Sequence, residues 1–149
     1  MIKIKIIFIS LIFLLASCGF SPIYIKNTNA NFSIENVIYN GDKELNNFLK
    51  TNLKKYKNER INKKVYIEAI SEYEKIILTK NTAGKVTNYK LVANVTFLIK
   101  STNRKINITE ERIINTMDDK FEEARKERVI KQNFASSISD KLASELIIN

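Results

Sequence analysis

The chain has 149 residues, which predicts one domain, and its 25 basic and 16 acidic residues give a formal net charge of +9. It contains no histidine and a single cysteine, which excludes an internal disulfide, a thiolate zinc site and histidine-based acid–base catalysis. The positive charge suits an anionic partner, but the lysines are scattered without interleaved aromatic residues, so we attribute most of the charge to AT-rich codon usage.

Residues 1–17 have the three-part organisation of a secretory signal. Lys3 and Lys5 form a positive n-region, the run from 6 to 15 is apolar but for one serine, and Ala16-Ser17 is small. The run is far shorter than the roughly 20 residues that span a bilayer. A buried core helix would also be apolar on all sides, but it would not stand at an extreme terminus behind two lysines. We therefore expect this segment to be a signal peptide.

The only cysteine, Cys18, stands directly after the apolar run. Leu15-Ala16-Ser17-Cys18 resembles the bacterial lipoprotein box, in which the thiolate receives diacylglycerol and the chain is cut just before the cysteine. The resemblance implies that Cys18 carries palmitate-type acyl chains. Each buried CH2 contributes about 0.8 kcal/mol to anchoring. Gly19 replaces the aspartate that often retains such proteins at the inner membrane, so the resemblance implies an outer-membrane address. Residues 18–31 are expected to be the lipidated N-terminus and a tether.

A single domain is expected over residues 32–149, and it opens with a strand and a helix. Phe32, Ile34 and Ile38 share one parity, which predicts a strand over 32–39. Gly41-Asp42 then predicts a turn in which the aspartate caps a helix. The next apolar residues follow helical spacing and predict an amphipathic helix covering a sheet: Leu45, Phe48, Leu49, Leu53 and Tyr56.

Three strand-like segments follow. The first, Val65 to Lys80, is rich in β-branched and aromatic residues, but its apolar residues change parity, which predicts a bulge near Glu72 to Glu74. The remaining elements are a hairpin loop at 81–85 with its glycine at positive φ, a regular strand at 86–100, a loop at 101–105 and a strand at 106–117.

The last predicted element is a long helix from Lys120 to about Ile147. Asp118 and Asp119 precede it, where negative charge suits the positive end of the helix dipole. Its first half (FEEARKERVIKQ) is highly charged and is expected to project toward solvent or a partner. Its second half carries an apolar stripe that is expected to cover the sheet: Phe134, Ile138, Leu142 and Leu146. The order β-α-β-β-β-α predicts an α+β fold with two helices on one face of a mainly antiparallel four-stranded sheet.

No group of residues predicts catalysis. The serines have no histidine partner, and the glycines of the mature chain stand singly, so no phosphate-binding loop exists. Five carboxylates could serve in acid–base work, although an exposed strand face explains them as well: Glu68, Glu72, Glu74, Glu110 and Glu111. We expect a non-enzymatic protein without cofactor or metal. A periplasmic hydrolase with an unusual site is a rival, and a nucleic-acid binder contradicts export.

Three segments resemble the LPS-assembly lipoproteins of the LptE family. Residues 18–24 (CGFSPIY) are similar to the Cys-Gly-Phe-x-Pro-Leu-Tyr start of that family, with Ile23 in place of leucine. Residues 84–91 (GKVTNYKL) are similar to its loop and Tyr-x-Leu strand, and residues 121–128 (FEEARKER) to its last helix. The resemblance implies the α+β fold given above. It also implies a plug that helps assemble the outer-membrane β-barrel of the LPS translocon, an LptD-like partner.

The resemblance further implies contact with lipopolysaccharide on its way to the cell surface. Cations can pair with lipid A phosphates, so we expect the contact to use five cations placed at one end of the central hairpins: Lys80, Lys85, Lys90, Arg104 and Lys105. The alternative is an envelope lipoprotein that scaffolds general outer-membrane barrel assembly without binding LPS.

Overall fold

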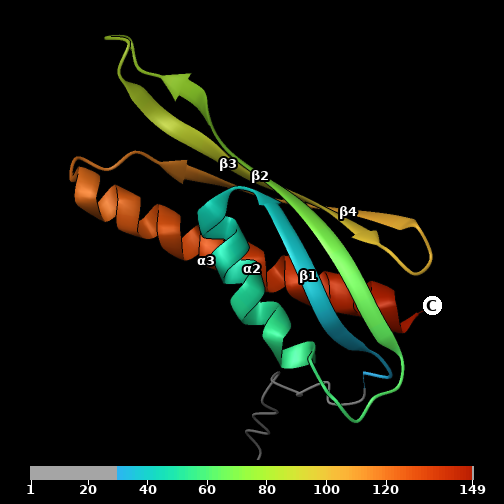
Figure 1. Cartoon of the computed structure of the whole chain (residues 1–149). Helices are drawn as coiled ribbons and strands as arrows, with labels where there is room; N and C mark the ends of the chain where they lie inside the picture. The colour runs from blue at the N-terminus through green and yellow to red at the C-terminus, as the bar shows by residue number, and fades with distance from the viewer. Residues whose placement is uncertain (1–29, 149) are drawn as a thin grey trace, which may run out of the picture.

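The computed structural model describes residues 30–148, and residues 1–29 and 149 lie outside the described part. The signal peptide, Cys18 and nearly all of the tether therefore lie outside the described residues. The elements follow the expected order (Figure 1): β1 (Ser33–Gly41), α2 (Lys43–Leu53), the 3-10 turn η1 (Lys54–Tyr56), β2 (Lys64–Lys80), β3 (Val86–Ile99), β4 (Arg104–Asn115) and α3 (Lys120–Ile147).

The four strands form one sheet in the order β1-β2-β3-β4. β2, β3 and β4 are antiparallel neighbours joined by short turns, whereas β1 runs parallel to β2. A parallel pair needs a crossover, which α2 supplies. Both helices lie on the same face of the sheet (Figure 1), so the predicted α+β class, with a mainly antiparallel sheet, is confirmed.

A bulge in β1 reverses which side chains in the second half of the strand point toward the core. The register of β1 against β2 shifts between Ile34 and Asn36. Beyond the shift, Val37 packs against the core and Ile38 is 52% exposed. The prediction that Ile38 shares the buried face of Phe32 and Ile34 is therefore wrong, because one inserted residue moves every later side chain to the other face.

β2 is regular where a bulge was expected. Its pairing with β3 is unbroken from Ile67 to Ile77, and the irregularity lies between Ile77 and Lys80. The predicted bulge near Glu72 to Glu74 is therefore wrong. The apolar residues near the end of the strand are exposed instead of buried, since β2 and β3 extend past the helical layer there (Figure 1).

The core lies between the sheet and the two helices. β3 supplies its centre, because its apolar residues alternate without interruption and all five from Leu91 to Ile99 are buried, as predicted. Ile106, Ile108 and Ile114 of β4 are buried beside them. The helices contribute Leu45, Leu49 and Leu53 from α2, and the predicted stripe from α3: Phe134, Ile138, Leu142 and Leu146.

Both helices begin at an aspartate cap. Asp42 Oδ1 accepts a hydrogen bond from the backbone N–H of Leu45 at 2.7 Å, which confirms the predicted cap. Asp119 Oδ1 accepts from the N–H of Phe121 at 2.8 Å. The residue before the first cap, Gly41, has φ +99°, and a Cβ there would lie 1.8 Å from the carbonyl oxygen of Ser71. Only glycine fits this junction between β1 and α2.

Candidate functional site

The most prominent surface feature is the free end of the β2–β3 hairpin, which projects past the helices (Figure 1). Asn81 closes its turn: its N–H donates to the Lys85 carbonyl at 2.8 Å, and its Oδ1 accepts from the N–H of Lys85 at 2.9 Å. Gly84 has φ +77°, as the loop prediction required. The turn is therefore an ordered hairpin connection.

Apolar side chains are exposed beside this turn. We call Ile76, Leu78 and Ile113 the hairpin patch; their exposed fractions are 41%, 42% and 62%. On the open face of the sheet, opposite the helices, Lys90 of β3 pairs in register with Ile76 of β2 on one side and with Ile113 of β4 on the other. The patch therefore surrounds a lysine, an arrangement that suits a ligand with both apolar and anionic parts.

Three of the five predicted contact cations lie at this end of the sheet. Lys80 ends β2, Lys85 lies in the turn, and Lys90 stands within the hairpin patch. Lys85 Nζ lies 3.4 Å from Asp118, with both side chains exposed, and Lys90 pairs with Glu111. Such exposed pairs stabilise little, and their lysines stay available to a stronger anion.

The other two cations lie at the opposite end. Arg104 and Lys105 begin β4, and the 14 residues of β3 separate them from the hairpin turn, about 40 Å of strand. The expectation that all five gather at one end, and that both of these lie in a loop, is therefore wrong. Arg104 instead joins β4 to the end of α3, where it donates to the Glu145 carbonyl at 3.2 Å and pairs with its carboxylate.

A partly buried ionic network, which the sequence did not predict, lies between α3 and β2. Lys75 Nζ lies 3.1 Å from Glu123 and 2.8 Å from Glu127, and the Tyr73 hydroxyl donates to Glu127 at 2.9 Å. Lys131 continues the network, 3.9 Å from the Tyr73 ring centroid. One side of the charged half of α3 thus packs on the sheet, which corrects the expectation that this half projects away.

The pKa values follow from these contacts. The backbone N–H of Met117, and then Lys120 and Lys75, lower the pKa of Glu123 to about 2. Burial lowers the pKa of Lys75, but its hydrogen bonds to Glu127 and Glu123 outweigh burial and raise it. Every partner is a structural neighbour, so the network holds α3 on the sheet. The four-residue spacing from Glu123 to Glu127 to Lys131 was the available signal, since it puts all three on one helix face.

The candidate acid–base carboxylates are dispersed. Glu68 pairs with Lys100 on the open face, Glu111 pairs with Lys90, and Glu110 accepts hydrogen bonds from Lys141 and Ser137 on the helix side. Over residues 30–148, no group of three or more acidic, histidine or cysteine side chains could hold a metal ion. Within the same range, none of the helices is long and apolar enough to cross a bilayer.

No protein-family model and no curated protein matches the chain. Solved structures do match. Rare lipoprotein B from Shewanella oneidensis has a TM-score of 0.53 at 12% identity, over 74% of this chain and 92% of that one. An uncharacterized lipoprotein B from Nitrosomonas europaea has a TM-score of 0.55 at 16% identity, over 79% of this chain and 86% of that one. A minor lipoprotein from Acinetobacter baumannii has a TM-score of 0.51 at 16% identity, over 78% and 95%. The chain shares the fold of these lipoproteins.

Proposed function

We propose that this chain is an outer-membrane lipoprotein that plugs and helps assemble the LPS-translocon β-barrel and contacts lipopolysaccharide during export. Three independent features support the proposal. The N-terminal sequence resembles a lipoprotein signal ending at Cys18. The fold is similar to that of solved bacterial lipoproteins. The hairpin end combines cations with exposed apolar side chains.

The hairpin end carries the proposed ligand contact. Lipopolysaccharide presents phosphates beside acyl chains, and a lysine between exposed isoleucines can meet both: Lys90 pairs with phosphate, while Ile76 and Ile113 cover apolar surface. Lys80 and Lys85 extend the positive charge to the turn. Among the described residues Lys80 has no ion-pair partner, so its charge is available to a ligand.

The topology also suits an anchored plug. Because β1 is parallel to β2, Ser33 lies beside Lys64, and the hairpin turn lies at the far end of β2, about 50 Å away along its 17 residues. A lipid anchor at Cys18 would therefore join the domain at the end opposite the hairpin. In the proposed complex, one end faces the membrane anchor and the other reaches along the barrel lumen.

Charge reversal tests the ligand contact. Lys85→Glu with Lys90→Glu should weaken lipopolysaccharide binding by the full-length protein in vitro, measured by titration with purified lipopolysaccharide. Lys105→Glu is the control for each single reversal, Lys85→Glu or Lys90→Glu, since it changes the net charge by the same amount at the other end of the sheet and should leave the affinity unchanged. Equal affinities for the wild type and the double variant would remove these two lysines from the proposal.

Co-purification separates the proposal from its alternative, a lipoprotein that scaffolds general barrel assembly without binding LPS. The tagged chain, isolated from envelopes in mild detergent, should bring down the LPS-translocon barrel. Recovery of a general barrel-assembly machine without the translocon would support the alternative. A hydrolase would instead show turnover of envelope substrates by the purified chain.

A further inference from the structure

β4 forms a free edge of the sheet. Among residues 30–148 its only strand neighbour is β3, so backbone N–H and C=O groups on its other side have no strand partner. The strand is long and regular, with 12 residues paired to β3 without a register shift and no proline. A regular edge of this kind is a template for another strand.

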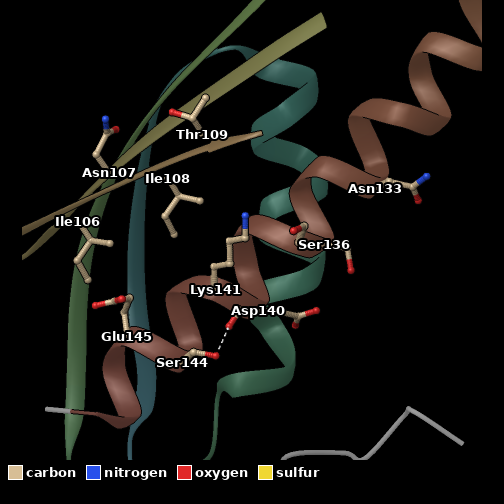
Figure 2. Close-up of a pocket in the computed structure, with 11 residues that line it drawn as sticks. Ile106, Asn107, Ile108, Thr109, Asn133, Ser136, Asp140, Lys141, Ser144 and Glu145 are labelled. Atoms are coloured by element: carbon tan, nitrogen blue, oxygen red, sulfur yellow. Dashed lines mark hydrogen bonds between the residues drawn. The ribbon is translucent and has the colours of Figure 1, made fainter. Parts of the chain in front are cut away.

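A groove runs beside this edge. It lies between β4 and the side of α3, has a volume of about 850 Å³, and includes Ile106 and Ile108 in its lining. Figure 2 shows these two side chains pointing toward α3, whereas Asn107 and Thr109 point the other way. The α3 wall carries serine, asparagine and lysine side chains and the carboxylates of Asp140 and Glu145. There is thus room next to the edge, lined mainly by hydrogen-bonding groups, because Ile106 and Ile108 are each only 7% exposed.

The charges along β4 select the strand that fits. Residues 106–109 are uncharged; Arg104 and Lys105 precede them, and Glu110 and Glu111 follow. In an antiparallel pair the first residues of one strand lie opposite the last residues of the other. A strand that binds this edge must therefore also begin with positive residues and end with negative ones, so that opposite charges meet at both ends. β4 of another molecule has that order.

One register satisfies both facing and charge. Side chains directly opposite each other in an antiparallel pair lie on the same face, so two copies keep their helices on one side when residues of equal parity pair. With Asn107 at the two-fold axis, Ile106 faces Ile108 of the second copy and Arg104 faces its Glu110. Moving the axis to Ile108 would instead place Arg104 opposite Arg112 of the second copy, which is unfavourable.

Ion pairs within each molecule extend the match. Arg104 pairs with Glu145, and Glu110 Oε1 lies 2.6 Å from Lys141 Nζ. The proposed register places these two pairs side by side across the junction. Glu145 and Arg104 of one copy are followed by Glu110 and Lys141 of the second copy, so negative and positive charges alternate along the row. Each charge then has neighbours of opposite sign, which favours association and fixes the register.

From these observations we propose that β4 is a self-association surface: two copies of this chain pair edge to edge around Asn107 and form a continuous eight-stranded sheet. The surface is separate from the hairpin end, so association leaves Lys85 and Lys90 open. The dimer is a state of the chain outside the barrel, because the proposed plug is a single copy. A partner strand from another protein is the competing occupant, and it predicts a monomer when the purified chain is studied alone.

Complementary charges at the axis test the proposal. Asn107 is exposed and on the open face, so Asn107→Lys and Asn107→Asp should each fold. Asn107→Lys loses the hydrogen bond that Asn107 Oδ1 accepts from the Thr96 hydroxyl, whereas the carboxylate of Asn107→Asp can still accept it. In each variant two like charges meet at the axis, and the dimer dissociation constant should rise by about tenfold or more. An equimolar mixture of the two variants should form a heterodimer of near wild-type stability.

The measurement is native mass spectrometry of the full chain in detergent, with excess empty micelles to prevent chance pairing. Asn36→Lys, an exposed asparagine on the opposite edge strand β1, is the matched control and should remain dimeric. A wild-type chain that is monomeric throughout, or a dimer that Asn107→Lys leaves intact, overturns the proposal. Monomeric single variants whose mixture also stays monomeric would equally overturn the Asn107 axis.

Discussion

Lys75 Nζ, on β2, lies 2.8 Å from Oε2 of Glu127, on α3, and 3.1 Å from Oε1 of Glu123 one turn earlier. This contact turns the charged half of α3 into part of the packed structure. Its ammonium also lies 4.4 Å from the centroid of the Tyr89 ring, which adds a cation–π contact. The helix, β2 and β3 thus meet at one lysine.

Glu123→Gln should destabilise the domain by about 1–3 kcal/mol, because the variant removes a buried charge that three donors hold. Glu123 is 5% exposed and accepts from Met117 N–H, Lys120 and Lys75. Urea unfolding followed by circular dichroism gives the free energy. Glu122→Gln, which removes an exposed carboxylate one residue earlier, is the control and should stay within about 0.5 kcal/mol of wild type.

The stability contributed by Glu123 should depend on pH. Its folded pKa of about 2 lies below the ordinary 4.5, so the folded state favours the ionised carboxylate. The contribution is complete above pH 4.5 and is lost as the pH falls from there toward 2. The difference in unfolding free energy between wild type and Glu123→Gln should therefore shrink over this interval. A constant difference would show that the charge of Glu123 does not carry the effect.

Alanine at the two described glycines should have unequal effects. At Gly84 a Cβ meets nothing within 4 Å, so Gly84→Ala costs only the positive-φ strain, about 1–2 kcal/mol. At Gly41 a Cβ would lie 1.8 Å from the Ser71 carbonyl oxygen, so Gly41→Ala must separate β1 from β2. We expect a loss above about 4 kcal/mol, or no folded protein. Thermal unfolding of both variants checks that Gly41→Ala is destabilised more than Gly84→Ala.

Cys18→Ser should abolish acylation. Cells grown with labelled palmitate should label the wild-type chain, because the proposed thioether forms only on a thiolate. Ser17→Ala keeps a small residue before the cysteine and should label normally. Equal labelling of Cys18→Ser would contradict the lipoprotein assignment.

Local patterns predicted most of the elements. β3 was predictable because apolar and polar residues alternate along it without a break to Ile99. Both helices were predictable because an aspartate cap precedes a periodic stripe of apolar residues. The bulge in β1 was not predictable, since the residues at the register shift, Glu35 and Asn36, are polar and leave no break in the apolar pattern. The parallel pairing of β1 depends on the crossover, which no short segment encodes.

The candidate site was predictable only in part. Lys85 was correctly placed in a hairpin turn, since its glycine and asparagine signal that turn directly. Arg104 was placed in a loop because its partner, Glu145, lies 41 residues away and is invisible to a local pattern. The Lys75 network was missed for a similar reason: charged residues at helical spacing usually face water, and only the sheet shows otherwise.

The parallel pairing of β1 has a consequence for the order in which the chain folds. β2, β3 and β4 are joined by turns of a few residues, so their contacts close over short loops. Ser33 of β1 pairs with Lys64, 31 residues later, and only after α2 has crossed the sheet. Low contact order favours early formation, so the meander should form first and β1 should add last. A chain delivered N-terminus first would therefore hold its leading strand unpaired until β2 has followed.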